Sequence, residues 1–98
     1  MVFAVRSMNY QHNRMLNICD AELVGRTFNK SDLSINISKS YFAERIVEEN
    51  EAEQLLKNAS IINMVGKETI ALSVRIGIGT KKGVKEIDGV PFLLVFKF

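Results

Sequence analysis

The sequence predicts an α+β domain in which one helix, over about residues 48–65, covers one face of a mostly antiparallel or mixed sheet of about five strands. Two observations lead to this fold class. Several short segments alternate apolar with polar residues, as half-buried strands do, and one longer stretch has its apolar residues at helical spacing. Because the 98 residues include one proline and no repeat or linker, we expect a single domain over residues 1–98.

The N-terminal segments predict a β-hairpin. Residues 2–6 and 15–19 are rich in β-forming side chains, and the polar residues 10–13 between them indicate a long, irregular loop. Asp20 is then expected to cap a short helical turn over residues 21–24.

Gly25 follows this turn at a position where a left-handed residue commonly ends a helix. Further along, Leu33, Ile35 and Ile37 alternate with polar residues. This period of two predicts a half-buried strand.

The helix over about residues 48–65 is predicted by apolar residues at near-helical spacing, namely Ala52, Leu55, Leu56, Ala59, Ile62 and Met64. Four glutamates lie in its opening turns, where the helix dipole favours negative charge. Gly66 is expected to end the helix.

The last third predicts two more strands. Residues 69–76 alternate cleanly between apolar and polar side chains, and Gly77 and Gly79 would break that strand. The Asp-Gly pair at 88–89 is a turn signal. Residues 91–98 predict the final strand, and because both of its faces are apolar we expect it to be central in the sheet.

The small net charge of +2 divides into two parts of opposite sign. Residues 44–53 hold five acidic residues and one arginine, a balance of −4 that a helix start explains. The remaining 88 residues balance to +6. This excess favours a polyanionic partner, and a nucleic acid is the first candidate.

A basic loop over residues 80–85 is the main candidate for binding. Its lysines would contact backbone phosphates without base preference, and the alternative is a solvated loop between strands. Tyr10 and His12 are candidates for stacking on unpaired bases. The candidate nucleic-acid contacts are Lys81, Lys82, Lys85, Arg6, Arg14 and Arg26.

Catalytic signatures are weak in this sequence. Cys19 and His12 could approach across the hairpin as nucleophile and base, with Asp20 or Glu22 orienting the imidazole. A buried, structural cysteine is the favoured interpretation, because free cysteines are among the most buried residues. The spacings of zinc, dinucleotide and Walker sites are missing, so we expect no metal and no cofactor.

The sequence also bears on the cellular compartment. A single cysteine cannot form an internal disulfide, and the N-terminal residues lack the pattern of a secretory signal. No apolar run reaches the roughly 18 residues of a membrane span. We therefore expect a soluble cytoplasmic protein that does not bind a membrane.

Residues 19–28, Cys-Asp-Ala-Glu-Leu-Val-Gly-Arg-Thr-Phe, resemble an early segment of the domain of unknown function 424 family. Residues 40–42 resemble the aromatic segment before the family's helix, residues 59–66 the end of that helix, and residues 87–91 the turn into the last strand. The resemblance implies an uncharacterised archaeal cytoplasmic protein, with a loose association to translation or RNA-related genes.

Two departures from the family pattern bear on activity. Ala43 and Glu44 stand where the family commonly has glycines, and Phe92 stands where it commonly has a histidine. If that histidine serves chemistry in relatives, this chain lacks the activity. Because Phe92 replaces this histidine, a catalytic function is less favoured for this chain.

Three functions follow, in order of preference. The first is a non-catalytic module that binds RNA or associates with the ribosome through the basic loop. The second is a protein-interaction module or homodimer that uses the apolar edge of the terminal strand, residues 91–98. The third is a small enzyme that uses Cys19.

Overall fold

A computed structural model describes residues 1–97, apart from the side chain of Tyr10. The stacking role expected for Tyr10 and the strand end expected at Phe98 therefore lie outside the described residues. Everything that follows concerns the described part of the chain.

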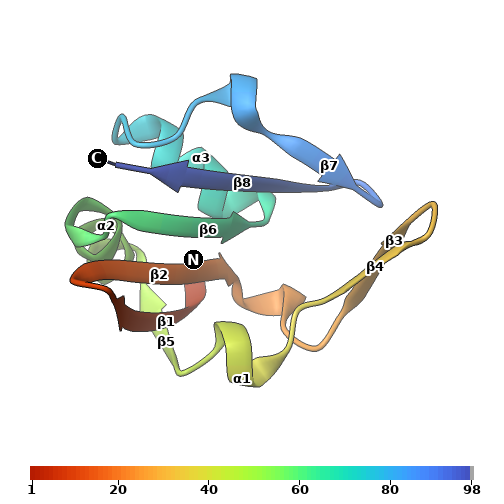
Figure 1. Ribbon diagram of the computed structural model, residues 1–98, viewed down its shortest axis with the longest axis horizontal. Coiled ribbons are helices and arrows are strands. Elements are labelled where there is room, and N and C mark those ends of the chain that lie inside the picture. The colour runs from red at the N-terminus through yellow and green to blue at the C-terminus, as the bar shows by residue number, and fades with distance from the viewer. Residues whose placement is uncertain (98) are drawn as a thin grey trace.

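Six strands form one mixed sheet in the order β5-β1-β2-β6-β8-β7 (Figure 1). Neighbouring strands are antiparallel except β2 and β6, which are parallel. The predicted fold class, an α+β domain with a mixed sheet, is confirmed. The six strands are β1 Val2–Tyr10, β2 Asn13–Asp20, β5 Arg45–Glu48, β6 Ile61–Val65, β7 Lys85–Ile87 and β8 Val90–Phe96.

The remaining elements lie around this sheet. Two short strands pair only with each other and form a separate ribbon. These are β3 Thr27–Lys30 and β4 Leu33–Asn36, and the helices are α1 Lys39–Phe42, α2 Glu49–Asn58 and α3 Lys67–Arg75, with 3-10 turns η1 Ala21–Leu23 and η2 Lys81–Gly83.

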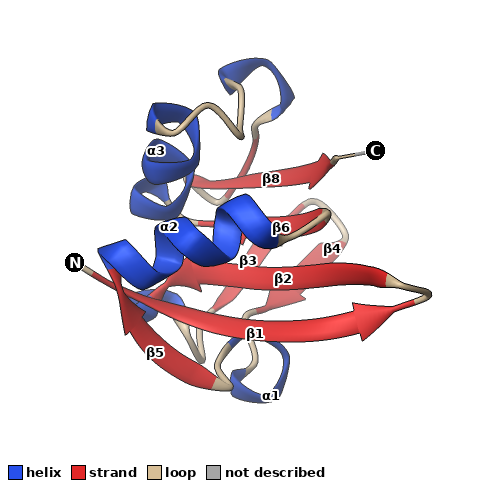
Figure 2. Ribbon diagram, turned by 90° about the vertical axis from the view of Figure 1, so that its left-hand side faces the viewer, coloured by secondary structure: helices blue, strands red, loops and turns tan. Residues whose placement is uncertain are grey.

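Helices α2 and α3 cover one face of the sheet, and Figure 2 shows them on the same side of it. Burial of apolar area in this layer is the main source of stability for such a small domain. The largest buried side chains between helices and sheet are Phe3, Val5, Leu16, Ile18, Leu56, Ile62, Met64, Leu72 and Leu93.

The opposite face of the sheet is covered only in part. The ribbon, η1 and α1 bury a second, smaller core against one end of the strands, consisting of Ala4, Cys19, Leu23, Phe28, Ile37, Phe42, Val65 and Ile87. The rest of this face is not covered by the ribbon, η1 or α1, and it is turned toward the viewer in Figure 1. We call its uncovered part the open face, and it carries Met8, Met15, Ile61, Asn63, Leu94 and Phe96.

The predicted helix over residues 48–65 is correct only in its first half. Helix α2 begins at Glu49, after Glu48 at the N-cap position, but it ends at Asn58, and Ile61–Val65 is strand β6. The apolar residues of this stretch fit both periods. Pairing with β2 and β8 buries Ile62 and Met64 on the helix side of the sheet, and this tertiary gain decides the conformation.

The strand predicted over residues 69–76 is wrong, because Lys67–Arg75 is helix α3. Its buried residues are Thr69, Ile70, Leu72 and Ser73, which lie three and four positions apart and form one helical face. The β-branched residues of this segment also satisfy a period of two. Gly66 therefore precedes a helix and does not end one.

The hairpin loop is shorter than expected. Strands β1 and β2 continue to a two-residue turn, Gln11–His12, in which φ is +48° and +70°. Two positive φ values match the right-handed twist of paired strands. The prediction of a long loop over residues 10–13 is therefore wrong. The predicted turn at 88–89 is confirmed, with φ of +56° and +78°.

Strand β8 pairs with β6 along most of its length, but with β7 only from Val90 to Phe92. It lies next to the edge of the sheet and not at its centre. On the open face, Leu94 is 54% exposed and Phe96 is 56% exposed. The strand is therefore interior to the sheet, between β6 and β7, but it is one position from the edge and its open-face side chains are exposed.

Candidate functional site

The three lysines of the predicted basic loop lie at one edge of the sheet. Lys81 and Lys82 belong to η2, and Lys85 begins the edge strand β7. Lys85 is the cross-strand partner of Phe92, so both side chains lie on the face that includes the open face. All three lysines are exposed. We call Lys81, Lys82 and Lys85 the basic edge.

The predicted arginines are distributed over the molecule. Arg6 pairs with Asn17, whose neighbour across the sheet is Asn63, so Arg6 lies on the same face as Lys85. Arg14 pairs with Asn9 and lies on the opposite face. Arg26 lies apart, with its guanidinium carbon 5.2 Å above the ring of Phe28. Sequence patterns cannot show this, because register decides which face a side chain takes.

The ion pairs distinguish the acidic residues of α2 from the candidate contacts. The three pairs among the described residues are Arg45–Glu51, Lys57–Glu53 and Arg75–Glu49, and each involves an acidic residue of α2. Within residues 1–97 none of the six candidate contacts has an acidic partner within 4.0 Å. The acidic helix start is thus largely neutralised by its own neighbours, whereas the positive charge of the basic edge is not.

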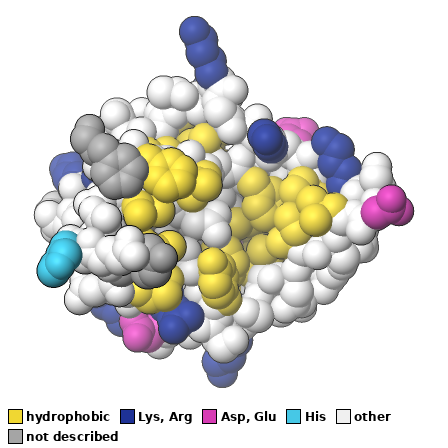
Figure 3. All heavy atoms as spheres, viewed as in Figure 1, with side chains coloured by type: hydrophobic (Ala, Val, Ile, Leu, Met, Phe, Trp, Pro, Cys, Tyr) yellow, Lys and Arg dark blue, Asp and Glu magenta, His cyan; other side chains and the backbone are white. Residues whose placement is uncertain are grey.

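The open face is an apolar platform that carries the amide of Asn63, whereas Asn17 in the same row is buried and donates to the carbonyl of Tyr41 in α1. Two rows cross the strands, one of Met8, Met15, Ile61 and Phe96, and one of Arg6, Asn17, Asn63 and Leu94. Figure 3 shows hydrophobic side chains gathered on this side of the molecule. A groove of about 380 Å³ lies between this platform and the basic edge, and it is lined by residues that include Ile35, Asn63, Lys85, Phe92 and Leu94.

The structure does not support the pair of Cys19 and His12. Cys19 is fully buried, and burial together with the nearby Asp20 carboxylate raises the pKa of its thiol to about 12. A thiol of this kind is a poor nucleophile at neutral pH. His12 lies in the hairpin turn at the other end of β2, about 20 Å away for seven extended residues. The idea that a hairpin would bring them together is wrong.

Asp20 has a role that sequence reasoning missed. It stands at the start of η1 but makes no side-chain cap there. Instead its carboxylate accepts hydrogen bonds from the first turn of α3: from the backbone N–H of Glu68 (3.2 Å) and from the N–H and hydroxyl of Thr69 (both 2.8 Å). The partners are 48 and 49 positions away, so no local pattern predicts the contact.

Gly66 makes this contact possible. It precedes α3 with φ of +112°, and a Cβ there would lie 2.6 Å from both carboxylate oxygens of Asp20. Only glycine fits both the backbone conformation and the space. The carboxyl ends of the two parallel strands, β2 and β6, are therefore locked together by a buried acid.

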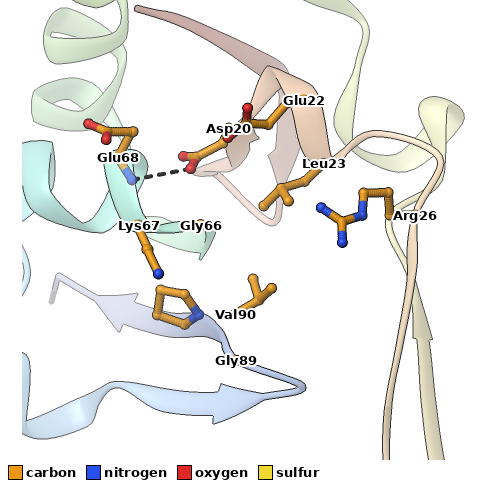
Figure 4. A pocket seen from close by; sticks show the side chains of 10 residues that line it. Asp20, Glu22, Leu23, Arg26, Gly66, Lys67, Glu68, Gly89 and Val90 are labelled. Carbon is orange, nitrogen blue, oxygen red and sulfur yellow. Dashed lines mark hydrogen bonds between the residues drawn. The ribbon is translucent and has the colours of Figure 1, made fainter.

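A hollow of about 270 Å³ opens beside this lock (Figure 4). We call it the end hollow, because it lies where β2 and β6 end. Ligands commonly bind in α/β proteins outside the carboxyl ends of parallel strands. The hollow is lined by Asp20, Glu22, Leu23, Arg26, Gly66, Lys67, Glu68, Gly89, Val90 and Pro91.

Three separate segments of the chain meet at the end hollow. Eight of its ten lining residues fall within residues 19–28, 59–66 and 87–91, which are three of the four segments that carry the family resemblance, and the other two, Lys67 and Glu68, follow directly after the second segment. The fourth, residues 40–42, packs elsewhere, since Phe42 belongs to the smaller core. The recognisable parts of this sequence therefore converge on one surface feature.

Residues 1–97 contain no group of three or more His, Cys, Asp or Glu side chains placed to hold a metal ion. Among the same residues, no helix has the length and apolar character needed to cross a membrane.

Comparisons with known proteins place the chain in a family. A family model described as "Protein of unknown function (DUF424)" matches residues 8–98. A solved structure, an uncharacterized conserved protein from Methanopyrus kandleri, superposes with a TM-score of 0.83 at 16% identity and covers 100% of this chain and 95% of its own. This likeness concerns the fold alone. No curated protein matches. The chain belongs to the DUF424 family, as the resemblance indicated.

Proposed function

We propose that this member of the DUF424 family is a non-catalytic module that binds RNA, free or within an assembly such as the ribosome. The observation that carries the proposal is the position of the open face beside the basic edge. Lys85 lines the groove beside the apolar platform, while Lys81 lies at the same edge of the sheet but toward α3. An apolar platform and nearby cations are the two properties that single-stranded RNA requires of a protein surface.

The lysines supply the electrostatic part. Lys81, Lys82 and Lys85 are exposed and have no acidic partner among the described residues, and Arg6 lies on the same face beyond Asn17 and Asn63. Each cation near a phosphate releases condensed counterions, which favours binding at low salt. Arg14 lies on the other face and Arg26 at the end hollow, so this surface does not use them.

The open face supplies the contacts to bases. Phe96 is 56% exposed and adds aromatic surface to the platform against which an unpaired base can pack. Asn63, which lines the groove, has an amide that both donates and accepts hydrogen bonds. Duplex RNA hides its base faces, so this surface favours single strands.

A titration with fluorescently labelled RNA tests the proposal. An unstructured RNA of about 12 nucleotides is titrated at several salt concentrations and compared with a duplex of equal length. The variant K81A/K82A/K85A should bind more weakly, and its salt dependence should fall by about two units of slope. K30A/K39A/K67A is the matched control, because it removes the same charge from exposed positions elsewhere that form no ion pair among the described residues.

The outcome depends on the contrast between the two triple variants. Equal losses in both would mean that only net charge matters and would refute the basic edge as the site. Phe96→Ala should lower affinity for the single strand about tenfold while leaving duplex binding unchanged. Absence of binding to the unstructured RNA at low salt would refute the function itself.

A second function is favoured by one observation. Leu94 and Phe96 are large apolar side chains exposed on the same face of β8, as in surfaces that pair two copies of a chain. Sedimentation velocity over a wide concentration range distinguishes the two proposals. A dimer that Leu94→Glu converts to a monomer would assign the open face to self-association, whereas a monomer at every concentration excludes it.

A further inference from the structure

We propose that the end hollow binds a small dipolar ligand of the α-amino acid class, which carries an ammonium and a carboxylate on neighbouring atoms. The site is distinct from the open face and uses none of the residues of the basic edge. The inference rests on the charges around the hollow, on the preorganisation of Arg26 and on the groups that form one side of the hollow.

The charges around the hollow are of both signs. Asp20, Glu22 and Glu68 line it together with Arg26 and Lys67. In Figure 4 Asp20 and Glu22 lie above the hollow, Arg26 reaches in from the right and Lys67 extends below Glu68, whose carboxylate points away to the left. A simple anion would meet two acids, and a simple cation would meet two bases. A ligand with one group of each sign satisfies both sides.

The charges do not satisfy one another within the protein. Among the described residues, neither Glu22 nor Glu68 nor Arg26 nor Lys67 forms an ion pair. All four are exposed at the rim. A ligand that bridges the two sides would therefore gain charge-assisted hydrogen bonds without breaking any that the protein already makes.

Arg26 is held ready for a carboxylate. Its guanidinium carbon lies 5.2 Å above the ring of Phe28, which is itself buried against Phe92 with ring centroids 6.3 Å apart. This cation–π contact restricts the guanidinium, which can offer a carboxylate two parallel hydrogen bonds. Fixing the side chain in advance reduces the entropy lost on binding.

One side of the hollow is formed by a hydrogen-bonded helix start and by buried apolar residues. The first turn of α3 is already capped by Asp20, so the ligand does not compete for the helix terminus. Leu23 is 6% exposed and Pro91 is buried, and both line the hollow. Apolar walls of this kind strengthen hydrogen bonds between charged groups by excluding water. The volume of about 270 Å³ is large enough for an amino acid. It is below the roughly 300–1,000 Å³ of pockets that hold drug-sized ligands such as nucleotides.

Amide NMR spectra of the intact protein provide the test. Glycine and a panel of L-amino acids are titrated to millimolar concentration, with acetate and methylammonium as single-charge probes at matched ionic strength. We expect an amino acid to shift the amide signals of Gly66, Glu68 and Gly89, and neither single-charge probe to do so. The amides of the open face, such as that of Leu94, should not move.

Variants assign the two ends of the ligand. Arg26→Gln and Glu22→Gln should each weaken binding about tenfold, because each removes one charge-assisted contact from an exposed position. Lys85→Ala is the matched control and should bind as the parent chain does. The proposal is overturned if no amino acid shifts these signals, if acetate alone reproduces the shifts, or if both variants bind unchanged. RNA binding by the open face is unaffected by any of these results.

Discussion

The two ends of the parallel β2–β6 pair differ in how their side chains are packed. At the carboxyl ends, a buried carboxylate, a glycine and the first turn of α3 interlock, and the hydrogen bonds of Asp20 leave no room for a Cβ at position 66. At the amino ends, Met15 and Ile61 lie side by side on the open face and are only half-buried. Stability is therefore concentrated at one end, and exposed apolar surface at the other.

This difference indicates how a domain of 98 residues divides its surface. A small core leaves little stability to spare, so the locked end should tolerate few substitutions. The exposed side chains of the open face, such as Leu94, contribute little to folding and can serve an interaction. The following measurements test that contrast, beginning with the largest expected effect.

Gly66→Ala should lower the free energy of unfolding by about 4 kcal/mol, because the new Cβ both strains the backbone and displaces the Asp20 carboxylate. Urea denaturation followed by circular dichroism measures the loss. Gly25→Ala is the matched control: φ is also positive there, at +91°, but a Cβ would meet no atom within 4 Å. The control should cost only about 1 kcal/mol. Equal losses at both positions would contradict the lock.

Asp20→Ala should cost about 3 kcal/mol, because the buried N–H and hydroxyl of Thr69 lose their acceptor. The same denaturation experiment measures this loss. In the double variant with Gly66→Ala the clash is gone, so the combined loss should be clearly less than the sum. Strict additivity would mean that the two residues act independently.

Stability at high pH depends on Cys19, next to the lock. The folded pKa of its thiol, about 12, lies above the reference value of 9.0, so stability is unchanged below pH 9 and falls as the pH rises from 9 toward 12. The slope should be at most about 1.4 kcal/mol per pH unit. Thermal melts over this range measure it, and Cys19→Ala should remove the slope. Thiol reagents should label the native protein only slowly at neutral pH.

Leu94→Ser, on the open face, should change the free energy of unfolding by less than about 0.5 kcal/mol. The side chain is 54% exposed, so little buried apolar area is lost. Leu93→Ser, one residue away but 5% exposed, is the internal comparison and should be strongly destabilising. Similar losses for the two would mean that the open face is part of the folded core.

Local features of the sequence were sufficient for much of the fold. The strand over residues 33–36, the acidic start of α2 and the turn at 88–89 follow from patterns within a few residues. Two elements were predicted wrongly because their apolar residues satisfy both periods: residues 61–65 form a strand, and residues 67–75 form a helix. There the choice depends on distant partners in the sheet.

The candidate sites were less accessible to sequence reasoning. Lys85 and Arg6 lie on one face and Arg14 on the other because of strand register, which single-sequence patterns do not determine here. Asp20 was expected to cap the turn that follows it, yet it caps a helix nearly fifty residues later. The end hollow combines three distant segments, so only the folded chain reveals it.

The parallel β2–β6 pair also has a consequence for the kinetics of folding. Within residues 1–97 it is the one strand pair that joins two triplets of strands, β5-β1-β2 and β6-β8-β7, and these come from opposite halves of the chain. Each triplet is held together by antiparallel pairs, of which β1–β2 and β7–β8 are local hairpins. In the β2–β6 pair, by contrast, Cys19 pairs with Val65, more than forty positions later in the chain. Closing so long a loop is entropically costly and slow. Docking of the two triplets is therefore expected to limit the folding rate, with the Asp20 contact formed only as they meet.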